Sequence, residues 1–226
     1  MNRVRRKENE AMRLSDFAAN AGVKKELMQA MENRSVPHAI IIEGESGCGK
    51  KTLAGIIAQY AVCSSDAERP CGVCPHCIKA EKGIHPDIFI ADGTQTGGLN
   101  IEAIRNIRSS AYIKPNEAGC KAYLLFNCDK MLMPAQNAFL KVLEEPPENV
   151  MFIMTVSSSA SLLQTVRSRS RIISLYPPDV DEAVEVLKNK LPDRFFETAV
   201  HNLLNHQLQH AIPCVTVFKL CSGLFF

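Results

Sequence analysis

The sequence predicts an α/β fold, with a parallel sheet flanked by helices and a small helical domain after it. Short apolar runs typical of buried strands alternate with segments of helical periodicity, and only helical patterns follow Pro177-Pro178. A glycine-rich turn also joins the first apolar run directly to a helix, which makes a strand-turn-helix unit. We therefore expect an α/β domain over residues 1–178 and a partial helical domain over residues 179–226.

The first part of the chain is predicted to contain a helix, a strand and a second helix. Residues 1–13 are polar and basic and are expected to form an extension. Apolar side chains at helical spacing predict a helix over residues 23–31, which the polar loop at residues 33–37 ends. The β-branched run at residues 38–43 predicts a strand, and residues 52–61 again show helical periodicity.

The middle of the chain continues this alternation. Apolar runs predict three further strands, and periodic apolar positions predict two helices, the second of which is stopped by Pro146-Pro147. The strands cover residues 87–91, 121–126 and 151–156, and the helices cover residues 101–108 and 135–143. Because strands alternate with helices, we expect the strands to pair in parallel within one sheet.

Composition excludes two classes of protein. Hydrophobic residues make up 46% of the 226 residues and charged residues 22%, which is typical of a globular chain and not of a disordered one. No apolar run approaches the length of about 18 residues that a membrane-spanning helix needs. The first ten residues lack the apolar stretch of a secretory signal, so we expect a cytoplasmic location and no membrane partner. The net charge of +2 gives no bulk attraction for nucleic acid.

Residues 44–50 match the phosphate-loop pattern G-x-x-x-x-G-K in its usual place between a strand and a helix. Glycines in this pattern allow backbone N–H groups to curl around phosphate oxygens, and the lysine reaches the terminal phosphates. The candidate nucleotide-contacting residues are Gly44, Gly47, Gly49, Lys50, Lys51 and Thr52. We therefore expect a phosphate-loop scaffold and not an ordinary glycine turn.

The groups that hold Mg²⁺ in a working phosphate-loop site are missing. Lys51 stands where a serine or threonine hydroxyl would bind the metal, and Thr52 lies one residue later. At the next strand end, Phe126 and Asn127 occupy the positions of the expected acids, and Asp129 is the only acid nearby in the sequence. We interpret the pocket as a retained fold that has lost its Mg²⁺ site and its hydrolysis, which also puts ATP binding in doubt. The alternative is that Thr52 and Asp129 substitute for the missing groups.

Four cysteines lie close together in the sequence, namely Cys63, Cys71, Cys74 and Cys77. Structural Zn²⁺ is held by four such ligands in a tetrahedron, and two overlapping C-x2-C steps with one earlier cysteine can close that shell. The alternative of disulfide bonds is disfavoured in a reducing cytosol. We expect a structural zinc module at about residues 62–80, with His76 as an alternative ligand and no open position for catalysis.

Three further motifs accompany the phosphate loop and the cysteine cluster. They are His85-Pro86-Asp87, the run of residues 137–147 that ends in Leu-Glu-Glu-Pro-Pro, and Thr165-Val166-Arg167-Ser168-Arg169-Ser170. Together these motifs resemble the delta-prime subunit family of the bacterial DNA polymerase III clamp loader, over about residues 14–191. The Leu-Glu-Glu-Pro-Pro run and the Ser-Arg step are together rather specific to clamp loaders.

This resemblance implies an AAA+ phosphate-loop domain with a helical lid, and a non-hydrolysing role within the DNA polymerase III holoenzyme. A subunit of this family helps to load the sliding clamp onto primed DNA as part of a hetero-oligomeric ring of clamp-loader subunits. The family's Ser-Arg-Cys motif presents an arginine finger to ATP on the neighbouring subunit, and the matching residue here is Arg169, with Ser170 replacing the cysteine. We expect the family's C-terminal collar domain to be absent, because the chain stops at Phe226 after an apolar stretch that does not match the family.

Two other functions fit parts of the sequence. The related gamma and tau subunits are active motor ATPases, but Lys51, Phe126 and Asn127 argue against that activity here. An unrelated zinc-dependent nucleic-acid-binding module would need a basic surface, which the near-neutral charge opposes. For Arg169 the alternative is a solvated surface arginine, although its planar, permanently charged fork suits a transferring phosphoryl group.

Overall fold

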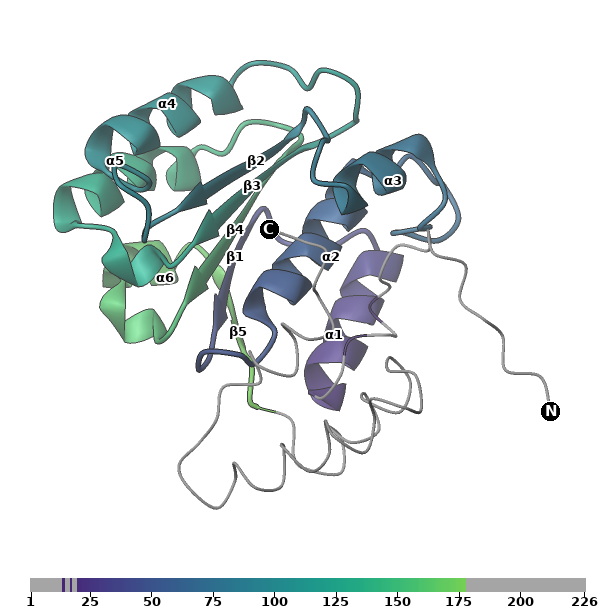
Figure 1. The fold of residues 1–226 in the computed structure, drawn as a ribbon, viewed down its shortest axis with the longest axis horizontal. Helices are drawn as coiled ribbons and strands as arrows, with labels where there is room; N and C mark the ends of the chain where they lie inside the picture. The colour runs from purple at the N-terminus through teal and green to yellow at the C-terminus, as the bar shows by residue number, and fades with distance from the viewer. Residues whose placement is uncertain (1–13, 15–16, 18–19, 178–226) are drawn as a thin grey trace, which may run out of the picture.

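The computed structural model describes residues 14, 17 and 20–177 of the chain (Figure 1). In this part of the chain a single five-stranded sheet has the order β2-β3-β4-β1-β5, and every neighbouring pair is parallel. The strands are β1 (Ala39–Glu43), β2 (Ile88–Asp92), β3 (Lys121–Phe126), β4 (Val150–Val156) and β5 (Arg171–Ser174). The predicted parallel α/β fold is therefore confirmed.

Helices cover both faces of the sheet (Figure 1). They are α1 (Ala21–Glu32), α2 (Lys50–Val62), α3 (Pro75–Glu81), α4 (Ile101–Ala111), α5 (Met133–Glu144) and α6 (Gln164–Arg167), with short 3-10 turns η2 (Cys128–Lys130) and η3 (Ser159–Ser161). Helices α1 and α2 pack on one face, and α4, α5 and α6 pack on the other. Within the described part of the chain, no helix has both the length and the apolar character needed to cross a bilayer.

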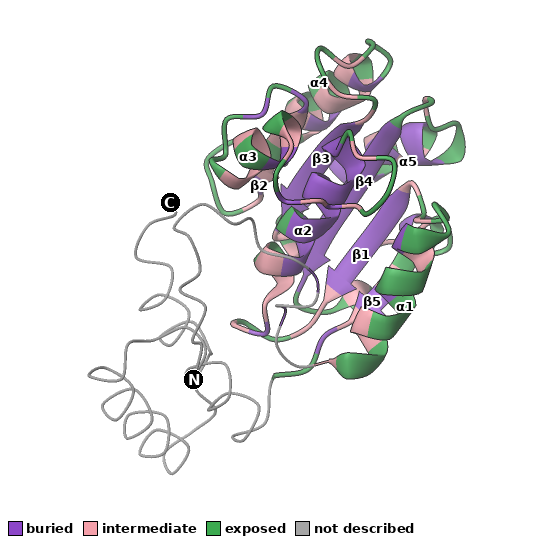
Figure 2. Cartoon of the chain, turned by 90° about the vertical axis from the view of Figure 1, so that its right-hand side faces the viewer, coloured by how far each residue is buried: buried purple, intermediate pink, exposed green. Residues whose placement is uncertain are grey.

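The apolar runs form strands because the sheet is buried on both faces. Along β1, Ile40 and Ile42 contribute to the core beneath α2, whereas Ile41 contributes to the core on the opposite face. All residues of β3 and β4 are buried, which Figure 2 shows as continuous purple strands. Complete burial of a large aliphatic side chain contributes about 1.5–3 kcal/mol, so these central strands carry much of the stabilisation. Both faces of a parallel sheet are packed against helices, so its strands appear in the sequence as unbroken hydrophobic runs.

Three short elements differ from the sequence-based expectation. The sequence predicts four strands, and the structure adds β5 at the edge beside β1. It also adds helices α3 and α6, which are too short to show the apolar periodicity by which a sequence predicts a helix. Helix α2 begins at Lys50, two residues before the predicted start, because Gly49 with φ of 91° precedes it as the N-cap. The predicted extension at residues 1–13 and the helical domain from residue 179 lie outside the described residues.

This topology brings two groups of candidate residues to the ends of one helix. The phosphate loop follows β1, so it lies at the sheet edge where the carboxyl ends of all the parallel strands meet. Helix α2 runs from this loop to Cys63, the first residue of the cysteine cluster. Helix α2 packs against α3, β3 and β4, so both ends are fixed to the same core.

Candidate functional site

The phosphate loop has the backbone form that its glycines allow. Gly44, Gly47 and Gly49 have positive φ angles of 151°, 90° and 91°, which L side chains rarely adopt. A Cβ atom at Gly44 would lie 2.4 Å from the carbonyl oxygen of Leu175. One at Gly49 would lie 2.8 Å from the ring of Phe17. Gly44 and Gly49 are therefore required by packing as well as by conformation, and Gly47 by conformation.

Lys50 binds its own loop in this structure. Its Nζ donates hydrogen bonds to the carbonyl oxygens of Gly44 at 2.6 Å and Glu45 at 2.7 Å. The two bonds hold the ammonium within the curve of the loop. Thr52, the later hydroxyl in the motif, is half-buried within the first turn of α2.

The residues that replace the metal-handling groups contact one another. The Nζ of Lys51 lies 2.9 Å from Oδ2 of Asp92, the last residue of β2. The same Nζ lies 4.7 Å from the centroid of the Phe126 ring. Asn127 donates from Nδ2 to Oδ1 of Asp92 at 2.7 Å. An ammonium and an amide nitrogen thus bond the pocket's carboxylate, and a phenyl ring faces the ammonium. These three groups do not fit Mg²⁺, which requires oxygen ligands.

Asp92 is held in its ionised form by four donors. Besides Lys51 and Asn127, Thr94 donates from its backbone N–H at 3.0 Å and from Oγ1 at 2.8 Å. The side chain is 12% exposed, and this burial alone would raise its pKa. The hydrogen bonds from Asn127, Thr94 and Lys51 outweigh burial and lower the pKa of Asp92 well below its ordinary value. The carboxylate is therefore charged throughout the neutral range.

The sequence indicates Asp129 as the only acid nearby, and Asp92 was missed. Asp129 accepts a hydrogen bond from the backbone N–H of Ser157 at 3.3 Å, whereas the acid bonded to Lys51 is Asp92, the last residue of another strand. The end of the apolar run at residues 87–91 was a signal that could have identified it. Carboxyl ends of parallel strands meet at one edge of a sheet, so an acid that follows any of these strands is a candidate.

The four cysteines form a compact group, as the sequence predicts. Their Sγ atoms all lie within 4.8 Å of one another. Two of these separations, from Cys63 to Cys74 and from Cys71 to Cys77, are 4.0 Å. A tetrahedron with Zn–S bonds of about 2.3 Å has sulfur atoms about 3.8 Å apart. The group therefore fits a structural Zn²⁺ ion held by Cys63, Cys71, Cys74 and Cys77.

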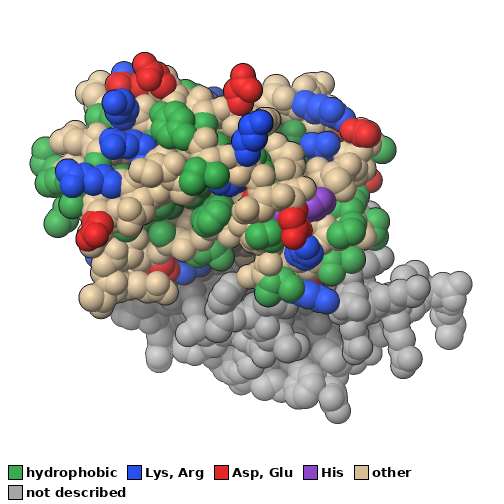
Figure 3. All heavy atoms as spheres, turned by 90° about the horizontal axis from the view of Figure 1, so that it is seen from above, with side chains coloured by type: hydrophobic (Ala, Val, Ile, Leu, Met, Phe, Trp, Pro, Cys, Tyr) green, Lys and Arg blue, Asp and Glu red, His purple; other side chains and the backbone are tan. Residues whose placement is uncertain are grey.

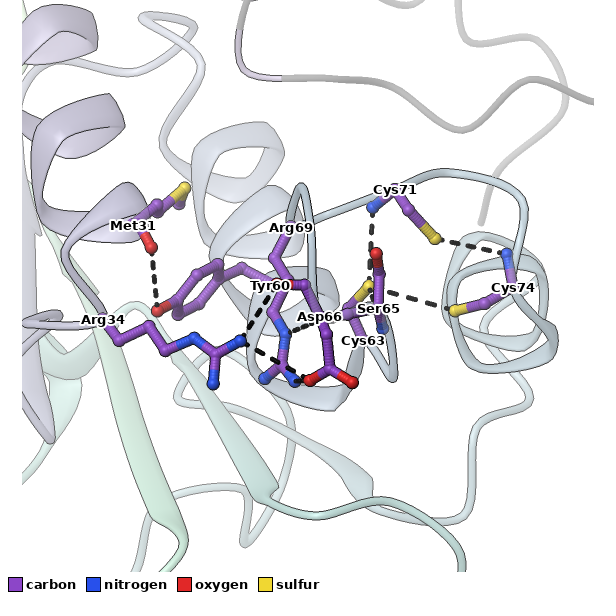
Figure 4. Close-up of polar contacts among 9 residues, drawn as sticks. All are labelled: Met31, Arg34, Tyr60, Cys63, Ser65, Asp66, Arg69, Cys71 and Cys74. Carbon is purple, nitrogen blue, oxygen red and sulfur yellow. Dashed lines mark hydrogen bonds and ion pairs between the residues drawn. The ribbon is translucent and has the colours of Figure 1, made fainter.

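Helix ends position these sulfur atoms. Cys63 is the C-cap of α2, and Cys74 is the N-cap of α3, where its Sγ accepts a hydrogen bond from the N–H of Cys77 at 3.4 Å. Figure 4 shows Cys63 facing Cys74, with the backbone N–H of Cys71 directed at the Cys63 sulfur. Burial opposes ionisation of Cys74, but hydrogen bonds from Cys77 and Ser64 lower its pKa to about 6. These donors favour the thiolate form of Cys74, whereas burial raises the pKa of the Cys63 and Cys77 thiols.

Side chains fasten the cysteine module to the core. Gln59 on α2 donates from Nε2 to the carbonyl oxygen of Cys77 at 3.0 Å. Arg34, just beyond α1, bonds the carbonyl oxygen of Asp66 at 3.1 Å (Figure 4). His76 Nδ1 lies 2.9 Å from His85 Nε2, so this ring links the module to the residues before β2. His76 thus has a bonding partner outside the cysteine group, and the compact group consists of the four cysteines without it.

Asp87 anchors the residues before β2. The residue is fully buried, and its carboxylate accepts backbone N–H bonds from Asn116 at 2.6 Å, Glu117 at 2.8 Å and Ala118 at 2.8 Å. Burial would raise its pKa, but these bonds dominate and lower it. Asp87 therefore clamps the segment that precedes β3 onto the start of β2.

Arg169 lies between α6 and β5, near the C-terminal end of the part of the chain that the structure describes. Its guanidinium forms an ion pair with Glu144 at 3.0 Å and donates to the carbonyl oxygen of Thr165 at 3.0 Å. The side chain is 36% exposed, so it remains accessible from outside the chain. Arg171 nearby pairs with Glu26 of α1. Arg169 is distinguished by its ion pair with Glu144, which joins it to the Leu-Glu-Glu-Pro-Pro run.

Charged residues of both signs are mixed on the surface seen from above. Figure 3 shows lysine and arginine side chains interspersed with acidic ones on this face. This face therefore carries no broad patch of one sign, in keeping with the net charge of +2.

Comparisons with known proteins identify relatives of the chain. The sequence profile of a family described as "DNA polymerase III, delta subunit" matches residues 19–179. A DNA polymerase III subunit delta' from Haemophilus influenzae is 32% identical over 153 residues, which are 68% of this chain and 47% of that protein. A DNA polymerase III subunit gamma/tau from Mycobacterium bovis is 29% identical over 145 residues, which are 64% of this chain and 25% of that protein. The chain spans about half the length of the delta' relatives that it matches.

A solved structure supports the fold. The AAA domain of FIGL-1, in complex with ADP, matches with a TM-score of 0.56 and 14% identity, covering 95% of this chain and 73% of that chain. At this identity the likeness shows the fold alone. It confirms that the sheet and its helices have the AAA+ arrangement.

Proposed function

The chain belongs to the DNA polymerase III delta subunit family, and from that membership we propose that it is a delta-prime-type clamp-loader subunit that hydrolyses no ATP itself. In this role it joins other clamp-loader subunits in a hetero-oligomeric ring in the cytoplasm. The ring loads the sliding clamp onto primed DNA. The chain's contribution to ATP chemistry is then made at a neighbouring subunit.

The observation that carries this proposal is the bonding of the phosphate-loop pocket. Lys51 occupies the position of the metal-binding hydroxyl and pairs with Asp92, while Phe126 occupies the position of an acid. A phosphoryl transfer site depends on Mg²⁺ to neutralise charge that develops on the phosphates. A pocket whose donor set does not fit Mg²⁺ lacks that contribution. Hydrolysis at this pocket is therefore not supported.

Arg169 is the residue that we assign to the neighbour's ATP. Its guanidinium is exposed in part, and both prongs of its fork are bonded within the chain, Nη2 to Glu144 and Nη1 to the carbonyl oxygen of Thr165. Arginine fingers raise the rate of phosphoryl transfer by about 10³–10⁵-fold because they stabilise charge in the transition state. To reach a neighbour's phosphate, the guanidinium exchanges its contact with Glu144 for one across the subunit interface.

Zn²⁺ has a structural role in this proposal. Cys63, Cys71, Cys74 and Cys77 hold it, and four thiolates close its coordination shell. The metal then supplies rigidity to the module that joins α2 to β2.

The test compares two arginine variants in an assembled ring. Because the chain spans half the length of its relatives, it is fused to the remaining half of the Haemophilus influenzae delta' protein and assembled with that organism's other subunits. Arg169→Ala is expected to lower clamp- and DNA-stimulated ATP hydrolysis by at least about tenfold, while ring assembly and zinc content stay unchanged. Arg169→Lys is expected to restore little of this ATP hydrolysis, because an ammonium lacks the two-pronged fork of a guanidinium. Arg171→Ala in the same segment is the matched control.

Two results would contradict the proposal. If the ring hydrolyses ATP equally well with arginine and with alanine at position 169, Arg169 is a solvated surface residue and not an arginine finger. Magnesium-dependent hydrolysis by the chain alone, abolished by Lys50→Ala, would favour the motor ATPase alternative, to which the gamma/tau relatives also point.

A further inference from the structure

The phosphate-loop pocket contains an ammonium in place of a metal. Lys51 Nζ lies 2.9 Å from Asp92 Oδ2 and 4.7 Å from the centroid of the Phe126 ring. The face of an aromatic ring attracts a cation but offers no ligand to a divalent metal. The ring and the carboxylate together thus provide a position for a singly charged nitrogen cation.

The hydrogen bonds to Asp92 occupy Oδ1 fully and place the Lys51 ammonium against Oδ2, the oxygen at which a metal would otherwise bind. A carboxylate offers about four lone-pair sites, and Asp92 already accepts four hydrogen bonds. One comes from Lys51 at Oδ2, and three come from Asn127 and Thr94 at Oδ1. A divalent ion at this carboxylate would displace these donors and would also lie against the Lys51 ammonium, which repels it.

We propose that Lys51 is a built-in cation that replaces the divalent metal of this pocket, and that Asp92 is the residue that holds it there. The inference rests on the proposed function and deepens it, because hydrolysis is then lost by replacement of the metal and not merely by loss of its ligands. Lys51 and Asp92 thereby determine that the pocket excludes divalent cations.

The exposure of Lys51 makes the inference testable by substitution. Its side chain is 58% exposed, and an ion pair that is exposed on the lysine side contributes little to folding. Lys51→Glu replaces the cation with a carboxylate close to Asp92, and two neighbouring carboxylates are the usual ligands of a hard divalent ion. A divalent ion is then expected to fill the position that the ammonium has left.

The experiment titrates the zinc-loaded chain with Mn²⁺ alone, which reports its site by paramagnetic broadening of nearby amide signals. The native chain is expected to show no Mn²⁺ binding at Thr94 or Asn127. Lys51→Glu is expected to bind Mn²⁺ at least about tenfold more tightly than the native chain, with broadening at those two residues. Lys114→Glu, an exposed lysine outside the pocket, makes the same change in net charge and is expected to gain nothing there. Adding Asp92→Asn to Lys51→Glu is expected to abolish the gain.

Two outcomes would overturn the inference. One is Mn²⁺ bound at Thr94 and Asn127 of the native chain as tightly as in Lys51→Glu. The other is no gain in Lys51→Glu or, should that variant not fold, none in Lys51→Thr, which removes the ammonium without adding charge. Neither measurement involves a ring or ATP hydrolysis, so this inference can fail while the Arg169 result stands, and the reverse also holds.

Discussion

Helix α2 carries a different motif at each end, and the two motifs differ in what their functional groups contact. At the C-terminal end, Cys63 meets three other cysteines whose sulfur atoms share one small volume. At the N-terminal end, Lys50 bonds the carbonyl oxygens of its own loop and Lys51 bonds Asp92. The sulfur atoms are placed around a common point, whereas the ammonium groups are already bonded within the chain.

A motif therefore predicts chemistry only when its groups stay available to a ligand. Both motifs are clear in the sequence, and both form with the expected backbone. The cysteine ligands come from one short stretch, so the motif contains everything that the site needs. The phosphate loop depends on acids from other strands, and those positions hold Phe126 and Asn127. Whether the phosphate loop can hydrolyse a nucleotide therefore depends on residues outside the motif.

The largest expected effect is at the cysteine end. Cys74→Ser removes one of four metal ligands, and structural zinc contributes about 10–16 kcal/mol of apparent binding energy in finger peptides. We expect the native chain to hold one zinc ion and the variant to lose it. Hydrogen exchange should then rise throughout residues 63–81 but stay unchanged in the phosphate loop.

Cys120→Ser is the matched control, because Cys120 lies outside the cysteine group and its Sγ donates to the carbonyl oxygen of Lys121. It should keep the full zinc content, as measured by elemental analysis. Less than half an equivalent of zinc in the native chain purified from zinc-replete cells would contradict the metal assignment. So would retention of a full equivalent in Cys74→Ser.

An intermediate effect is expected at Asp87, the residue just before β2. Asp87→Asn replaces an acceptor of backbone N–H bonds with an amide that has its own N–H groups, so we expect the free energy of unfolding to fall by about 2–4 kcal/mol. Because the folded pKa of Asp87 is lowered, its carboxylate stabilises the chain above the unfolded pKa of about 3.9. That stabilisation is lost as the pH falls through the folded pKa.

Urea unfolding at several pH values measures both effects. Between about pH 4 and pH 2, the native chain should lose more stability than Asp87→Asn does, because only the native chain has this carboxylate to protonate. Identical pH dependence in the two chains would show that the Asp87 carboxylate does not contribute in this way.

The smallest effect is expected from Lys51→Met at the phosphate-loop end. The pair with Asp92 is exposed on the lysine side, so its loss should change the free energy of unfolding by less than about 1 kcal/mol. Lys114→Met serves as the control for loss of an exposed lysine in the same urea measurement. If Lys51→Met lowers the free energy of unfolding more than Asp87→Asn does, the expected order is wrong and the Lys51–Asp92 pair is a major contribution to the stability of the fold.

The sequence predicted the central sheet well because its strands are buried on both faces. The predicted strands at residues 121–126 and 151–156 agree with β3 and β4 to within one residue. Strand β5 was missed because it is four residues long and has a polar residue at each end, Arg171 and Ser174. Helix α3 was missed because its start is set by Pro75 and by the Cys74 cap and not by an apolar stripe.

The candidate sites were predictable to the extent that their residues are neighbours in the sequence. The zinc ligands and the phosphate-loop glycines could be named because each group occupies a single stretch. The contact of Lys51 with Asp92 joins residues 41 positions apart, and the ion pair of Arg169 with Glu144 joins two separate motifs. Both depend on strand order and on helix packing, which periodicity does not specify. Whether Arg169 acts on a neighbour stays a prediction.

The placement of the cysteines bears on the length of chain that the fold can accept between α2 and β2. Residues 63–87 form this connection, and connections longer than about 12–15 residues without structure of their own are uncommon. A metal at the four cysteines cross-links the connection into short closed segments. The conformational entropy lost on closing the connection is then divided among these short segments. Extra residues between Cys63 and Cys71 would then lengthen one segment without altering the sheet. By this reasoning the module is a tolerant point for chain insertion, whereas the tightly packed phosphate loop at the other end of α2 is not.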